Sequence, residues 1–129
     1  MDKDTEGTSQ YSVDVRVRIR KDETVVYGTG ISELLLKTDQ LKSLNAAAKE
    51  LGMPYRKALF IVTRAEEEFG KKILEKSIGG VGGGGSHLTE FGHYLVYQFH
   101  VLEEEVSTYA KKLMDDYFPS DHIQEETAE

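Results

Sequence analysis

The stretch "GGVGGGGSHLT", residues 79–89, limits the possible folds more than any other part of the chain. It has six glycines in its first seven positions. Glycine reaches backbone conformations with positive φ and allows close approach to a partner, but it weakens helix and strand interiors. The stretch is therefore predicted to be a loop, and its flanking residues decide which kind of loop.

A nucleotide-binding loop is one alternative, because Gly80, Gly82 and Gly85 match the pattern GxGxxG. That fold needs a strand, the glycine turn, a helix and a second parallel strand within about 30 residues. Here the helix after the loop is predicted to continue to Pro119, and no strand follows. No GK[ST] follows the glycines either, so a phosphate-binding P-loop is not predicted. We expect no cofactor.

A β-hairpin wing fits the flanking residues better. "KKILEKSI", residues 71–78, is predicted to be a strand, and "HL", residues 87–88, a short return strand. The glycines would then form the tip of the hairpin. Such a tip either approaches a DNA backbone or minor groove, or is a surface hairpin that touches nothing.

Two helices precede this hairpin. Residues 43–51 begin at a plausible N-cap, Ser43, and Gly52 ends the helix. Pro54 suits the first turn of the next helix, which Gly70 ends. About three residues join the two helices, which is typical of a helix-turn-helix. One stripe of the second helix is predicted to face inward, with Ala58, Ile61, Val62, Ala65 and Phe69.

The N-terminal part predicts a β-hairpin and a further helix. Residues 1–11 are expected to be a disordered tail. In residues 12–20, Val13, Val15, Val17 and Ile19 alternate with Asp14, Arg16, Arg18 and Arg20, which predicts a half-buried strand. "KDET" predicts a turn, and "VVYG" a return strand. The helix at residues 30–41 would face inward with Ile31, Leu34, Leu35 and Thr38.

A long helix is predicted from Thr89, its N-cap, to residue 118. Apolar residues along it follow spacings of 4, 3, 4, 3 and 4, which is a heptad seam. This seam forms a dimer interface or folds back on its own domain. Residues 119–129 are expected to be an acidic, disordered tail. The seam consists of Leu95, Phe99, Leu102, Val106, Tyr109 and Leu113.

Composition excludes several classes of protein. There is no cysteine, no apolar run long enough to span a membrane and no apolar N-terminal signal, so we expect a cytoplasmic protein. The net charge is −7, yet residues 43–88 hold seven Lys or Arg against five Asp or Glu. His100 with Glu103 or Glu104 has metal-compatible spacing, but two ligands do not make a site. The glutamate runs at 66–68 and 103–105 are interpreted as solvated helix faces, and we expect neither metal nor enzyme activity.

Several motifs together resemble a known family. "SLNAAAKELGMPYRKALFIVTRAEEEFGKKILEKS" is similar to the winged helix-turn-helix of LysR-type regulators. The "GGVGGGG" wing and the "LTEFG" that opens the long helix resemble more closely the N-terminal domain of molybdate-dependent transcriptional regulators. The resemblance covers residues 13–118 and implies a homodimer on operator DNA. It makes residues 43–51 the positioning helix and 54–69 the recognition helix. The oxyanion-binding domains of that family have no counterpart in these 129 residues.

Candidate DNA contacts follow from this context. Side chains at the start of a recognition helix reach base edges, and arginine is the commonest specific reader of guanine. Hydroxyl and amide groups at the first helix, and lysines near the hairpin, would contact phosphates. Ordinary surface charge is the alternative for the charged candidates, a helix cap is the alternative for Ser43, and cover of its own domain is the alternative for Phe60. The candidates are Ser43, Asn45, Tyr55, Arg56, Lys57, Phe60, Thr63, Arg64, Lys76, Gly82, Gly83 and His87.

The sequence thus predicts an α+β fold: a winged helix-turn-helix at residues 12–88 with an N-terminal β-hairpin and a glycine-rich wing, and a long dimerisation helix at 89–118. The predicted function is a transcriptional regulator that binds duplex DNA sequence-specifically as a homodimer. Two alternatives stay open: a winged-helix module that binds protein instead of DNA, and a stand-alone sensor of molybdate or tungstate.

Overall fold

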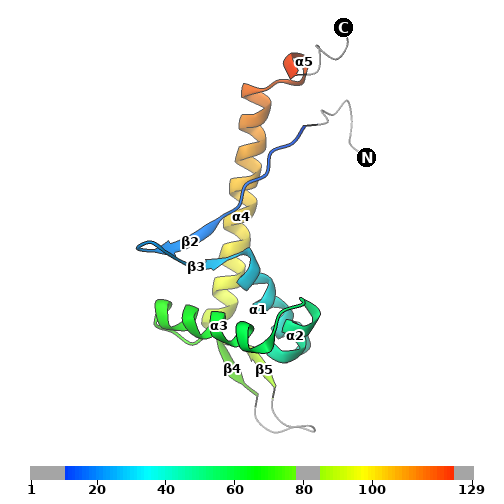
Figure 1. Ribbon diagram of the computed structural model, residues 1–129. Helices are drawn as coiled ribbons and strands as arrows, with labels where there is room; N and C mark the ends of the chain where they lie inside the picture. Colours follow the sequence, from blue (N-terminus) through cyan, green and yellow to red (C-terminus); the bar gives the residue numbers. More distant parts are fainter. Residues whose placement is uncertain (1–10, 78–84, 124–129) are drawn as a thin grey trace. The chain divides into compact units, whose positions relative to one another are not determined.

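A computed structural model describes residues 11–77 and 85–123 of the chain (Figure 1). The predicted wing tip, with Gly82 and Gly83, and most of the two predicted tails lie outside these residues. Two compact units divide the chain. One is Val17–Val101; the described residues of the other are 11–16 and 102–123. The division falls within the long helix, whereas the sequence analysis separated it at residue 89.

The first hairpin pairs β2 (Arg18–Lys21) with β3 (Thr24–Gly28) in antiparallel register. Asp22 adopts a positive φ of 57° in the turn, as the "KDET" turn predicted. The predicted strand at residues 12–20 was wrong in its extent, because pairing begins only at Arg18. Residues 11–17 form no strand, since β3 ends opposite Arg18 and nothing further along it continues the ladder.

Three helices follow. They are α1 (Thr29–Leu41), α2 (Leu44–Glu50) and α3 (Tyr55–Phe69). The hydroxyl of Ser43 accepts a hydrogen bond of 2.9 Å from the amide of Ala46, which confirms the predicted N-cap of α2. Gly52 and Gly70 adopt φ values of +70° and +73° at the helix ends, a conformation that favours glycine. The helix-turn-helix pattern predicted both ends correctly.

A second hairpin and the long helix complete the described chain. β4 (Leu74–Lys76) pairs antiparallel with β5 (Ser86–Leu88), so the predicted return strand is confirmed. α4 runs from Glu90 to Tyr117, and the short α5 covers Ser120–Ile123, where the sequence predicted no element. No helix in the described ranges is long and apolar enough to cross a membrane.

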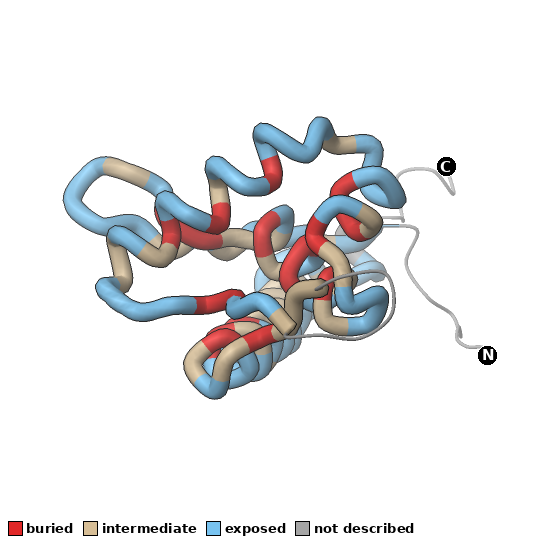
Figure 2. Tube along the Cα trace, turned by 90° about the horizontal axis from the view of Figure 1, so that it is seen from below, coloured by how far each residue is buried: buried red, intermediate tan, exposed pale blue. Residues whose placement is uncertain are grey.

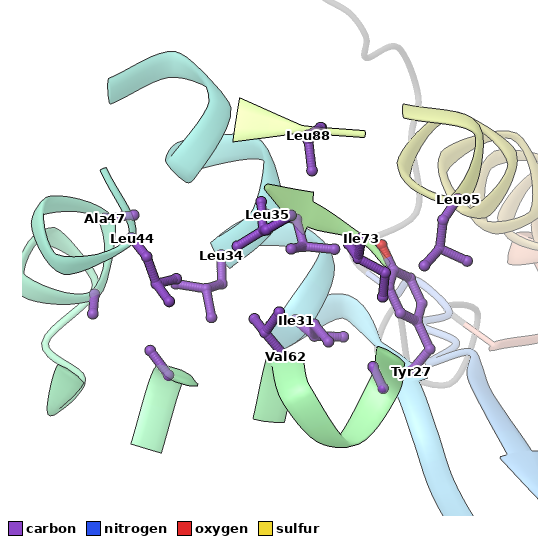
Figure 3. Packing of buried hydrophobic residues seen from close by; sticks show 14 of the residues in the cluster. Tyr27, Ile31, Leu34, Leu35, Leu44, Ala47, Val62, Ile73, Leu88 and Leu95 are labelled. Carbon is purple, nitrogen blue, oxygen red and sulfur yellow. The ribbon is translucent and has the colours of Figure 1, made fainter. Parts of the chain in front are cut away.

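The core of the Val17–Val101 unit combines one face from each element (Figure 3). Buried positions recur at intervals along the helices, with exposed positions between them (Figure 2). The predicted inward residues of α1 are all buried: Ile31, Leu34, Leu35 and Thr38. In α3, Ala58, Val62 and Ala65 are buried, while Ile61 and Phe69 pack partly against the core.

An aromatic contact ties α4 into this core. The ring of Tyr27, 1% exposed, packs edge-on against Phe99 at 5.0 Å and Phe69 at 6.3 Å between centroids. Its hydroxyl donates to the hydroxyl of Ser32. The resulting fold is α+β with a β-hairpin, packed helices and a long C-terminal helix, an arrangement compatible with a winged helix-turn-helix.

Candidate nucleic-acid interface

The base of the second hairpin is fixed to the helices by hydrogen bonds. We name Leu74–Ser77 together with Gly85–Leu88 the hairpin root. The amide of Ser86 donates to the carbonyl of Lys42 in the α1–α2 turn at 3.0 Å, and Ser77 donates to Gly85 at 2.9 Å. A Cβ at Gly85 would collide with that same Lys42 carbonyl, so only glycine allows this approach.

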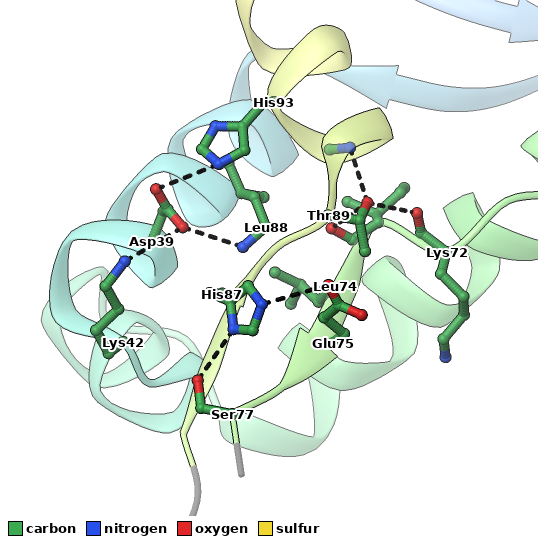
Figure 4. Close-up of polar contacts among 12 residues, drawn as sticks. Asp39, Lys42, Lys72, Leu74, Glu75, Ser77, His87, Leu88, Thr89 and His93 are labelled. Carbon is green, nitrogen blue, oxygen red and sulfur yellow. Dashed lines mark hydrogen bonds and ion pairs between the residues drawn. The ribbon is translucent and has the colours of Figure 1, made fainter.

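Asp39, near the end of α1, holds the root from the other side (Figure 4). Its carboxylate accepts a 3.0 Å hydrogen bond from the amide of Leu88 and lies 3.6 Å from Lys42 Nζ and 3.9 Å from His93 Nε2. Burial alone raises the pKa of Asp39, but the Leu88 hydrogen bond and the charges of Lys42 and His93 outweigh it and hold the pKa below its ordinary value. Sequence patterns gave no sign of this role.

Glu66 anchors the start of β4 from α3. Its carboxylate accepts hydrogen bonds from the amides of Ile73 (2.9 Å) and Leu74 (3.1 Å) and pairs with Lys72 Nζ at 3.4 Å. The interpretation of Glu66 as part of a solvated face was therefore wrong: its side chain is 12% exposed. The sequence did not distinguish the two roles, because a glutamate in the last turns of a helix is usually surface charge. Its anchoring role appears only when the position of β4 is known.

Thr89 joins the root to α4. Its hydroxyl donates to the carbonyl of Lys72 at 2.7 Å and accepts from the amide of Gly92 at 3.0 Å, as the predicted N-cap requires (Figure 4). Its own amide donates to the Ile73 carbonyl at 2.9 Å. Helix α4 therefore starts at a defined place beside β4.

These ties bring four predicted DNA contacts together around one cavity of about 440 Å³. The cavity lies where the start of α2, the start of α3 and the hairpin root meet. Ser86 was not among the predicted contacts, because its place in the cavity depends on the return of the hairpin to the helices, which leaves no periodic signal in the sequence. The lining residues are Ser43, Leu44, Asn45, Tyr55, Lys76, Gly85 and Ser86.

Lys76 is the charged member of this lining. Its ammonium makes no ion pair with any other residue that the structure describes. Neighbouring Lys72 differs, because it is paired with Glu66, and Lys71 lies over the ring of Phe91 at 5.2 Å. The cavity therefore offers one cation with hydroxyl and amide groups, which is the chemistry that contacts a phosphate.

The outward face of α3 continues beside the cavity. All of its predicted contacts are exposed, and Phe60 is 61% exposed. Within the described ranges, no side-chain hydrogen bond or ion pair engages Arg56, Lys57 or Arg64. Exposed Leu59 on α3 also adds apolar surface that the sequence analysis did not single out. The exposed contacts are Tyr55, Arg56, Lys57, Phe60, Thr63 and Arg64.

His87 has its partners within the hairpin. Nδ1 lies 3.0 Å from the hydroxyl of Ser77, and Nε2 lies 3.3 Å from the carboxylate of Glu75, which sits directly across the ladder. The structure therefore groups His87 with hairpin residues, apart from the cavity lining. Asn45 is exposed at the cavity, whereas Gly82 and Gly83 lie outside the described residues.

The predicted seam of α4 divides into two parts. Leu95 (6% exposed) and Phe99 (2%) pack into the core of their own unit, so the alternative of folding back holds for them. In the other unit, Leu102 is 42% and Tyr109 61% exposed. The remaining seam residues, Val106 and Leu113, are half-buried.

The fold and the site together describe an α+β domain, compatible with a winged helix-turn-helix, that exposes cations beside a polar cavity. Over 90 residues the chain is 29% identical to a protein of Yersinia pestis named transcriptional regulator ModE. The match covers 70% of this chain but 34% of that protein, so the chain spans about a third of the length of the curated relative. No family model matches.

Proposed function

We propose that the chain is a transcriptional regulator that binds duplex DNA with α3 in the major groove. The observation that carries the proposal is the cavity where Ser43, Asn45, Tyr55 and Lys76 meet beside the outward face of α3. One phosphate contact at the cavity would fix the register of the duplex, and α3 would then present its first residues to base edges.

Arg56 is the proposed reader of base sequence. It stands in the first turn of α3, is exposed, and its guanidinium has no partner among the described residues. An unpaired guanidinium keeps its planar pair of donors available for the O6 and N7 atoms of guanine. Lys57 and Arg64 would add phosphate contacts along the same face.

A labelled random-sequence duplex tests DNA binding. Fluorescence anisotropy at about 50 and about 200 mM salt should detect binding that weakens steeply with salt, because each neutralised phosphate releases counterions. Absence of binding at the lower salt would contradict the proposal. It would instead favour the protein-binding alternative, for which the exposed apolar Leu59 and Phe60 on the same helix face are the supporting observation.

We also propose a homodimer whose seam is the part of α4 from Leu102 onward. Leu95 and Phe99 are occupied in their own core, which leaves the exposed Leu102 and Tyr109 to meet a second copy. A coiled-coil contact between two such stripes buries apolar surface that one copy leaves in water.

Sedimentation equilibrium of two matched variants tests the seam. Tyr109→Glu should dissociate the dimer, because it puts a charge into the stripe. Tyr97→Glu changes an equally exposed tyrosine (65% against 61%) on the opposite side of the same helix and should leave the dimer intact. Equal effects of the two variants would remove the seam from the proposal.

A further inference from the structure

The segment Ser12–Arg16 has the alternating pattern of a strand but pairs with no strand in the described part of the chain. Its valines alternate with Asp14 and Arg16, and Val15 is 42% exposed. Among the described residues, no backbone hydrogen bond is found for Ser12–Arg16. β3 is too short to pair with it, because β3 ends opposite Arg18.

Unpaired, extended backbone of this kind is a template for another strand. The segment belongs to the same compact unit as the part of α4 that follows Leu102, and Figure 1 draws the two side by side. That part of α4 carries the proposed dimer seam. A second copy of the chain that meets the seam would therefore bring its own Ser12–Arg16 close to this one.

The sequence of the segment is complementary to itself in one antiparallel register. When Val15 lies opposite Val15 of the second copy, Asp14 faces Arg16 of that copy, and Arg16 faces its Asp14. On the other face, Val13 lies opposite Val17, the residue that directly follows the segment. Opposite charges and β-branched residues at directly opposed positions both stabilise an antiparallel pair.

Neighbouring registers lack this match. A shift of two residues one way places Asp14 opposite Asp14, and a shift of two the other way places Arg16 opposite Arg16. A shift of one residue places each valine opposite a charged residue. Like charges directly opposed destabilise a ladder, so the charges select the register centred on Val15.

We infer that Ser12–Arg16 pairs antiparallel with the same segment of a second copy, with the two-fold axis at Val15. The inference rests on the homodimer proposed above and goes beyond it, because it adds a β-ladder and a fixed register to the helical seam. The alternation of valines with charged residues near the N-terminus then serves assembly.

Single cysteines test the register, because the natural chain has none. Val15→Cys places two thiols opposite each other, within the Cα separation that a disulfide accepts. Val13→Cys is the matched control, since its two copies would lie roughly 13 Å apart at about 3.3 Å per residue. Under mild oxidation of the full chain, we expect disulfide-linked dimers from Val15→Cys and none from Val13→Cys.

Charge exchange tests the pairing independently. Asp14→Arg and Arg16→Asp each oppose like charges twice per dimer and should raise the dimer Kd about tenfold. The double variant D14R/R16D restores opposite charges and should return the Kd to within about threefold of the natural chain. Glu33→Arg, an exposed site on α1, changes the net charge by the same amount as Asp14→Arg and should leave the Kd unchanged.

Two outcomes would overturn the inference. In the first, a dimer forms but Val13→Cys crosslinks as well as Val15→Cys, or the double variant dimerises as weakly as the single variants. That outcome rejects the ladder and is still consistent with the α4 seam. A chain that stays monomeric at all concentrations rejects both the ladder and the homodimer. DNA binding is measured separately by anisotropy, so its failure remains distinguishable.

Discussion

The hairpin root and the outward face of α3 differ in whether their polar side chains have partners within the fold. Around the root, the side chains of Asp39, Glu66 and Thr89 each bond to a backbone amide or carbonyl of a neighbouring element. On α3, Arg56 and Arg64 have no such partners among the described residues. The difference is that the polar groups around the root hold neighbouring elements in place, while those of α3 stay exposed, as the proposed DNA binding requires.

The largest effect is expected from a substitution that disrupts the packing of α4 against the hairpin root. Gly92 lies in the first turn of α4, where a Cβ would collide with the Ile73 carbonyl and press on Leu88. Gly92→Ala should therefore lower the free energy of unfolding by about 1–3 kcal/mol, measured by urea denaturation. Gly30→Ala in α1 is the matched control, because nothing lies within 4 Å of its added Cβ.

That control should gain up to about 1 kcal/mol from alanine's higher helix propensity. If Gly92→Ala were as stable as Gly30→Ala, the close packing of α4 against β4 and β5 would be wrong.

The next effect concerns the free face of α3. Arg56→Ala should cost about 1–3 kcal/mol of discrimination between the preferred duplex and one with its guanine replaced. Stability should not change, because the guanidinium has no partner in the described fold. Anisotropy with both duplexes measures the difference. Lys111→Ala, an exposed change on α4, is the control and should leave discrimination intact.

Lys76, which lines the cavity, and Lys72, which is paired with Glu66, extend this comparison to phosphate binding. Lys76→Ala should weaken binding about equally for all sequences and lower the salt slope by about 1, because it removes one phosphate contact. Lys72→Ala should leave the slope unchanged, since Lys72 is already paired with Glu66. Equal slopes for the two variants would mean that the cavity does not hold a phosphate.

The smallest effect is the pH dependence of the root. The pKa of Asp39 is lowered in the fold, so the stability it contributes is present above the unfolded pKa, about 3.9, and is lost as pH falls through the lower folded pKa. Asp39→Asn should therefore lose less stability than the natural chain as the pH falls through the unfolded pKa and then through the lower folded pKa.

Periodicity predicted the helices well because it reports which side of an element is apolar. The inward residues of α1 and the ends of α3 followed directly from that pattern and from Gly70. Periodicity does not report the partner, however. It could not tell that Leu95 and Phe99 pack inside their own unit, nor that Ser12–Arg16 pairs with no strand in the described part of the chain.

The candidate site was predictable in part for the same reason. Exposed cations on α3 follow from its helical spacing, whereas the cavity depends on contacts distant in sequence. Ser86 meets Lys42, and Leu88 meets Asp39, only because the hairpin returns to the end of α1. Individual hydrogen bonds of this kind leave no periodic pattern in the sequence, so the sequence alone did not predict the hairpin root.

The most direct test of the account is amide chemical-shift mapping by NMR as a duplex is added to the full chain. We predict that the largest shifts fall at the cavity and on α3, at Ser43, Tyr55, Arg56, Lys76 and Ser86. Shifts confined to α4, with none at the cavity, would contradict a DNA-binding surface built from the hairpin root and α3.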